Sequence, residues 1–139
     1  MSNFQGYLFK ATDSNQIFPM KYIAYNTWKS TPNQREEIKA YRDDNTRNLT
    51  RVTASGTKSV FQFDTRDTIT LDEKMEIQAF FTDNESVALE RKINITYWND
   101  EENAYKTGAF YRPDIVFQIK HIEGNNIIYS KATIKLIEY

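Results

Sequence analysis

Apolar and polar residues alternate with a period of two along most of the chain, which is the pattern of β-strands. The clearest stretch is 91–98, where Ile93, Ile95 and Tyr97 fall on one side. Short polar runs such as 12–15 and 123–126 predict turns between strands. The alternation predicts further strands at about 5–11, 20–29, 59–64, 105–111, 115–121 and 127–139, with Pro32 ending the second of them.

One segment, at about 70–82, has the spacing of an α-helix instead. Thr70 and Glu73 match a capping box, in which each residue bonds the backbone of the other. Asn84 is expected to end the helix in a left-handed conformation. The apolar face of this helix is predicted to contain Leu71, Met75, Ile77, Ala79, Phe80 and Phe81.

Consecutive strands joined by short turns favour antiparallel sheets. The predicted fold is therefore mainly β, an antiparallel β-sandwich or incomplete barrel with one α-helix packed on it. With 139 residues and no linker or internal repeat, the chain is predicted to form a single domain over residues 1–139.

Residues 36–42 and 49–54 predict a protruding polar hairpin, at about 36–54, with few apolar side chains. An isolated two-stranded hairpin is marginally stable in water, so we expect this one to become ordered on a neighbouring subunit. Its arginines can pair with carboxylates, which favours a protein contact. The candidate oligomer-interface residues are Arg35, Glu36, Glu37, Tyr41, Arg42, Asp43, Arg47, Leu49 and Arg51.

The charges nearly cancel, because 18 Lys and Arg stand against 19 Asp and Glu. Binding to the phosphates of nucleic acid requires a concentrated positive field. Specific nucleic-acid binding is therefore not expected, and DNA would at most pass through an assembly without being bound. The N-terminus lacks a signal-peptide pattern and no apolar run approaches about 20 residues, so we expect no membrane span and synthesis in the cytoplasm.

Catalytic chemistry has little support in the residues. The chain has no cysteine, and His121 is its one histidine, on a strand where a structural or partly exposed role is favoured. The acidic clusters lack the spacing that wraps carboxylates around Ca²⁺. We therefore expect no enzyme, no catalytic residue, no cofactor and no metal site.

Aromatic residues leave one alternative open. Trp28 and Trp98, together with nearby tyrosines, could form a platform that stacks on sugars. Aromatic residues on half-buried strands more often fill a core or a subunit interface. A carbohydrate- or receptor-binding β-sandwich is thus the alternative function.

Several segments resemble small proteins of tailed phages and prophages of Gram-positive bacteria, a family whose members are called tail or baseplate proteins. The similar segments are 31–35, 41–43 with 49–51, 58–65, 106–115 and 136–139. The order of elements is also similar to the tail-tube fold of tube, distal-tail and tail-completion proteins.

The resemblance implies a virion structural protein that forms a ring, a hexamer by analogy, in the tail, tail tip or baseplate. It implies contacts with other tail proteins, a place in the virion tail, and assembly in the host cytoplasm. A head-tail connector or tail-completion protein is the other role that it leaves open. The family offers no catalytic residues to carry over.

Overall fold

Strands make up about half of the computed structural model. It describes residues 3–34, 37–42, 49–53 and 58–139, and of 37–42 and 49–53 it describes the backbone. The predicted mainly-β fold, with antiparallel strands and one α-helix, is confirmed in this part of the chain. In chain order the elements are β1 (Phe9–Ala11), the 3-10 turn η1 (Met20–Tyr22), β2 (Lys29–Gln34), β3 (Glu37–Arg42), β4 (Leu49–Thr53), β5 (Lys58–Asp64), β6 (Ile69–Thr70), α1 (Leu71–Asn84), β7 (Glu85–Val87), β8 (Lys92–Asn99), β9 (Ala104–Tyr111), β10 (Ile119–Glu123), β11 (Asn126–Tyr129) and β12 (Thr133–Glu138).

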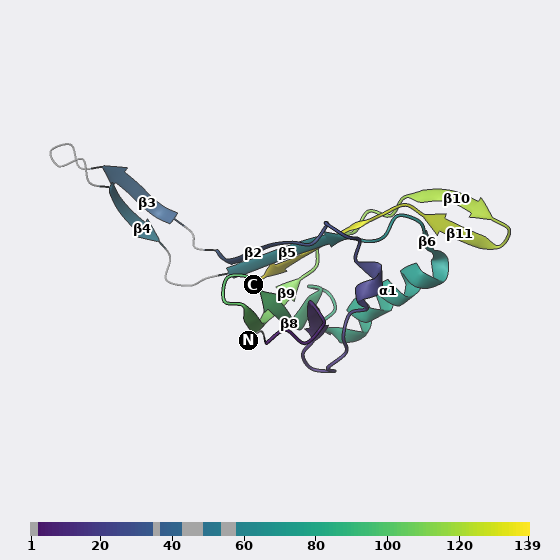
Figure 1. Ribbon diagram of the computed structural model, residues 1–139, viewed down its shortest axis with the longest axis horizontal. Helices are drawn as coiled ribbons and strands as arrows, with labels where there is room; N and C mark the ends of the chain where they lie inside the picture. The colour runs from purple at the N-terminus through teal and green to yellow at the C-terminus, as the bar shows by residue number, and fades with distance from the viewer. Residues whose placement is uncertain (1–2, 35–36, 43–48, 54–57) are drawn as a thin grey trace.

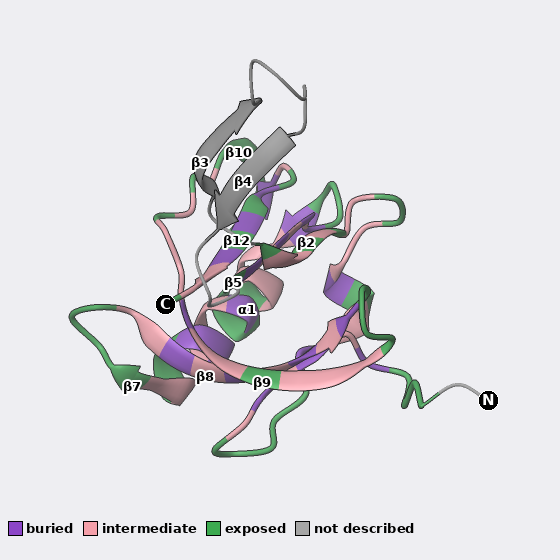
Figure 2. Ribbon diagram, turned by 90° about the vertical axis from the view of Figure 1, so that its left-hand side faces the viewer, coloured by how far each residue is buried: buried purple, intermediate pink, exposed green. Residues whose placement is uncertain are grey.

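The main sheet has seven antiparallel strands in the order β1-β8-β9-β12-β5-β2, with β7 also paired to β8. In the long β8–β9 hairpin, Ile93 lies opposite Phe110. Between β5 and β12, Phe61 lies opposite Leu136. All four side chains are buried, because opposed residues of a ladder share one face of the sheet. Buried positions recur along β5, β8 and β12, which carry buried colour in Figure 2.

An aromatic core brings the two ends of the main sheet together. Phe9 on β1 packs against Phe61 and Phe63 on β5, with ring centroids 5.3 and 5.7 Å apart. The ring centroid of Phe18 lies 4.8 Å from that of Phe9 and 5.2 Å from that of Phe80 on α1. The sheet therefore curls around these rings into an incomplete barrel, and in the described residues β1 and β2 are not paired with each other.

The strand predicted at 20–29 is wrong. Met20–Tyr22 form η1, and Asn26 has a left-handed φ of 64°, which interrupts an extended chain. This segment bridges the gap in the barrel, since the Phe18 amide bonds the Phe9 carbonyl and the Ala24 amide bonds the Asp64 carbonyl.

Pro32 lies within β2 and does not end it, which corrects the prediction. β2 is the last strand of the main sheet, and its pairing with β5 is irregular between Thr31 and Gln34. Proline lacks a backbone donor, so an irregular edge strand is where a sheet accommodates it.

The helix begins as predicted. The Glu73 amide donates to the Thr70 hydroxyl at 3.3 Å, and the Thr70 amide donates to the Glu73 carboxylate at 3.2 Å, which completes the capping box. Ile77, Phe80 and Phe81 are buried against the core.

Two predictions about the helix are wrong. Met75 is 55% exposed, because it lies off the face that Ile77 and Phe80 present to the core. The helix also continues through Asn84, whose side-chain amide donates to the Phe80 carbonyl, and it ends at Glu85 in an extended conformation with φ −69°.

The C-terminal strand predicted at 127–139 is divided between two sheets. β12 joins the main sheet, whereas β11 lies in a three-stranded sheet of order β10-β11-β6. Next to the division, the backbone amide of buried Thr65 donates to the Ala132 carbonyl, and the Ala132 amide donates to the Thr65 hydroxyl. The strand predicted at 115–121 likewise begins only at Ile119, where pairing with β11 starts.

The two hairpins lie at opposite ends of the molecule (Figure 1). β3 and β4 form a separate two-stranded sheet beyond β2 and β5, and β10 with β11 extends past α1 at the other end. The predicted protruding hairpin is confirmed in its backbone.

The Tyr22 hydroxyl donates to the Glu76 carboxylate and ties η1 to α1. Burial, together with this hydrogen bond, raises the pKa of Tyr22 to about 12, above the ordinary value of 10.0 for a tyrosine. The folded protein therefore holds this proton to higher pH than the unfolded chain does. The stabilisation is complete below pH 10.0 and is lost as the pH rises through about 12.

Replacing Tyr22 by phenylalanine should flatten the alkaline loss of stability. The wild type should lose roughly 2 to 3 kcal/mol more than Tyr22→Phe between pH 9 and 12, measured by urea unfolding. Tyr25→Phe is the matched control, because the Tyr25 side chain is 97% exposed and should leave the wild-type curve unchanged. Parallel curves for wild type and Tyr22→Phe would contradict this assignment.

Candidate assembly surface

The candidate interface residues fall on the β3–β4 hairpin, which we call the arm (Glu37–Arg42 with Leu49–Thr53). Its strands pair antiparallel with each other and with no other strand of the described chain. Of the predicted residues, the backbones of Glu37, Tyr41 and Arg42 lie in β3, and those of Leu49 and Arg51 in β4. The predictions for Arg35, Glu36, Asp43 and Arg47 lie outside the described residues.

The pairing register brings several of these positions together. Arg42 lies opposite Leu49, Tyr41 opposite Thr50, and Ala40 opposite Arg51. The arm is therefore an antiparallel ladder of five to six residues per strand, with an irregularity between Glu37 and Lys39. A ladder of two strands leaves both outer edges with unpaired backbone groups, and such edges are templates for a further strand.

A polar cluster fixes the strands from which the arm emerges. The backbone amide of Asn33, near the end of β2, donates to the hydroxyl of Ser59 on β5 at 3.1 Å. Tyr97 on β8 donates its hydroxyl to the same oxygen at 2.8 Å. Asn99 donates to the Asn33 side chain at 3.1 Å. Ser59 and Asn99 are almost fully buried, so these bonds are shielded from water.

A carboxylate completes this cluster, which we call the clamp (Asn33, Ser59, Tyr97, Asn99 and Glu138). Glu138 on β12 accepts the Ser59 amide at 2.8 Å. Its side chain lies over Gly108, where a β-carbon would overlap the carboxylate. Residues from β2, β5, β8 and β12 thus meet at the root of the arm.

Sequence reasoning did not find the clamp. One residue type in the clamp could have been noticed in the sequence. Asn33 has a left-handed φ of 53°, a conformation that asparagine adopts more readily than most residues other than glycine. Its partners Ser59 and Asn99 are 26 and 66 residues away along the chain, so no local pattern links them.

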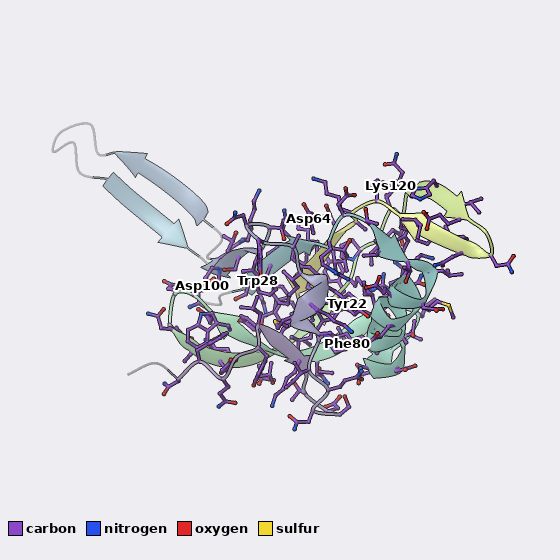
Figure 3. The ribbon with its side chains drawn as sticks, turned by 45° about the vertical axis from the view of Figure 1, so that its right-hand side comes forward. Tyr22, Trp28, Asp64, Phe80, Asp100 and Lys120 are labelled. Carbon is purple, nitrogen blue, oxygen red and sulfur yellow. The ribbon has the colours of Figure 1, made fainter. Side chains whose placement is uncertain are left out.

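The two tryptophans lie in different clusters. Trp28 stacks on Phe61 with ring centroids 4.9 Å apart, which places it against the core (Figure 3). Trp98 instead meets Phe4 and Tyr105 edge-on, at 5.3 and 5.2 Å. No ring contact joins Trp28 to Trp98 in the described residues, so the structure does not bring them into one sugar-stacking platform.

Ionisable groups form no obvious chemical centre. His121 is partly exposed, as predicted, and its Nε2 lies 3.1 Å from Glu123. No three His, Cys, Asp or Glu side chains gather around one point in the described residues. Two open grooves of about 350 and 340 Å³ flank Tyr25 and are lined mainly by apolar side chains. No described helix is long and apolar enough to cross a membrane.

The most strongly buried ion pair joins Arg112 to Glu85, 3.5 Å apart, with the guanidinium over the Phe81 ring at 5.2 Å. Burial lowers the pKa of Arg112, although the Glu85 carboxylate acts in the opposite direction. An arginine stays charged at neutral pH despite such a shift. This pair therefore holds β9 against the end of α1 and offers no acid–base chemistry.

Comparison with known proteins identifies a family but no activity. A family model described as "Family of unknown function (DUF6711)" matches residues 1–139, so the chain belongs to this family. A search of curated proteins finds no match. One similar solved structure is "Tail of empty GTA particle computed with helical refinement, C6 symmetry", with 13% identity and a TM-score of 0.47. That match covers 98% of this chain and 94% of the other, and at this level it carries no argument about function.

Removing the Ser59 hydroxyl should loosen the root of the arm. Ser59→Ala should lower the free energy of unfolding by about 1 to 3 kcal/mol, because it leaves two buried donors without an acceptor. It should also accelerate amide hydrogen exchange at Asn33, whose amide bonds this hydroxyl. Tyr105→Phe is the control, since it removes a hydroxyl that bonds the Tyr7 carbonyl elsewhere. Unchanged exchange at Asn33 in Ser59→Ala would show that the clamp does not hold the arm.

Proposed function

We propose that this member of the DUF6711 family is a non-enzymatic structural subunit of the tail of a bacteriophage or prophage particle. It acts as a single domain and assembles with copies of itself into a closed ring, through the arm. The observation that supports this proposal is the arm itself, a two-stranded sheet at one end of the molecule (Figure 1).

The arm lacks the means to be stable alone. Two strands without a covered face gain too little from their own hydrogen bonds to remain folded in water. The segment 36–54 contains four basic and four acidic residues, and few large apolar ones. Contact with another subunit would supply the missing strand partners and offer partners for these charges.

The clamp supports a mechanical role for the arm. Its buried hydrogen bonds join β2 and β5 to β8 and β12 at the point where the arm leaves the body. A fixed root restricts the directions in which the arm can reach, and a constant direction is what a repeating contact requires. Head-to-tail repetition of one contact about an axis closes into a ring.

The remaining parts of the proposal follow from the sequence resemblance. The ring has six copies, belongs to the tail tip or baseplate, contacts other tail proteins, and assembles in the host cytoplasm before residing in the virion. DNA passes without being gripped, in keeping with a net charge of −1.

Two other roles remain predictions. A head-tail connector or tail-completion protein would use the same arm against different neighbours. A carbohydrate- or receptor-binding protein would depend on Trp28 or Trp98, and the separation of these residues gives that role no added support.

Deletion of residues 37–53, replaced by a short Gly-Ser linker, tests the proposal directly. Light scattering should show a discrete oligomer for the wild type and a monomer for the deletion variant. The melting temperature of the deletion variant should be unchanged, because the arm contributes little to the stability of the body of its own molecule. The charge-reversed variant Arg42→Glu/Arg51→Glu should weaken assembly at least about tenfold, which corresponds to about 1.4 kcal/mol.

The matched control reverses two lysines of the body, Lys10→Glu/Lys21→Glu, and should assemble like the wild type. A wild-type protein that stays monomeric at high concentration would refute the proposed function. Intact rings from the deletion variant would show that the arm is not the contact.

A further inference from the structure

The end of the molecule opposite the arm carries a free strand edge. β10 is the terminal strand of the three-stranded sheet and pairs on one side with β11. On its other side no strand is paired within the described residues. All five of its residues are exposed, so none of them belongs to the core.

This edge exposes two large apolar side chains. Ile119 and Ile122 of β10 are 53% and 68% exposed, and the exposed His121 and Glu123 of the same strand pair with each other at 3.1 Å. Natural proteins protect free edges with outward-pointing charges, above all lysine. The one lysine of β10, Lys120, is bound instead to the Asp67 carboxylate at 3.0 Å and the Thr68 hydroxyl at 2.8 Å (Figure 3).

The arm and this edge have matching dimensions. β3 and β4 contain six and five residues, and β10 contains five. Within one molecule the two lie at opposite ends of the long axis, so they cannot pair with each other (Figure 1). A second copy, displaced along that axis, brings its arm to the β10 edge.

We propose that the free edge of β10 receives the arm of the next copy, which adds its two strands to the β10-β11-β6 sheet. The addition satisfies the open backbone groups of both partners and covers Ile119 and Ile122 from water. The contact is heterologous, because one copy contributes its arm and the other its β10 edge, and such contacts build rings or filaments. This inference rests on the proposed function and names the surface that accepts the arm.

Cysteine cross-linking tests the contact, and the natural chain contains no cysteine to interfere. Two full-length double variants each place one thiol on the arm and one on β10. The arm thiol lies on β3 in Ala40→Cys/Ile122→Cys and on β4 in Thr50→Cys/Ile122→Cys. A short bismaleimide should convert at least one of them into a ladder of covalent multimers. The controls are Ala40→Cys/Leu89→Cys and Thr50→Cys/Leu89→Cys, which move the second thiol from β10 to position 89. Leu89 is 96% exposed, so this thiol is accessible to the reagent, and the controls should give no ladder.

A second variant measures the edge without a cross-linker. Ile119→Lys/Ile122→Lys should keep the wild-type melting temperature, since both side chains are exposed, and should weaken self-assembly at least about tenfold. Val87→Lys/Leu89→Lys is the matched control on another exposed apolar pair and should assemble normally.

The outcomes separate the two ideas. If the wild type assembles and loses assembly when the arm is deleted, but the β10 variants neither cross-link selectively nor weaken assembly, the arm docks elsewhere and this inference is overturned. If the wild type is monomeric, the proposed function fails first.

Discussion

Packing among aromatic rings is the interaction on which the rest of this structure depends. β1 has three residues and pairs with β8 alone among the described strands, so side chains connect it to the far side of the main sheet. Phe9 on β1 makes that connection, with its ring 5.3 Å from that of Phe61 on β5 and 5.9 Å from that of Trp28, just before β2. Aromatic pairs contribute about 0.5–1.5 kcal/mol beyond the area that they bury. The curled body that results is the platform from which both hairpins project.

The two ends of this platform differ in chemistry. One end carries the polar arm, whose root is held by buried hydrogen bonds between Asn33, Ser59 and Tyr97. The other end carries an open strand with exposed Ile119 and Ile122. Unlike ends suit head-to-tail contacts, and rings and tubes are built by repeating such contacts. In the proposed assembly, the body would keep a constant geometry between the two ends.

Local patterns in the sequence predict much of this architecture. The alternation at 91–98 corresponds to β8, the capping box marks the start of α1, and the polar segments at 36–42 and 49–54 become the arm. The errors have tertiary causes. Residues 20–28 cross the opening of the barrel and lie outside the named strands, and the predicted last strand is divided because β11 and β12 pair in different sheets. The candidate interface residues could be assigned to a hairpin, but their partners could not.

The sequence by itself determined the start of the helix and the presence of the arm and of strands such as β5, β8 and β9, because those features depend on the pattern of side chains over a few neighbouring residues. The tertiary structure decided which strands pair, and therefore which edge is left open. It also assembled the clamp from Asn33 and partners up to 105 positions further along the chain, such as Glu138. Burial and hydrogen-bond partners arise only when distant segments meet in space, and no local pattern encodes them.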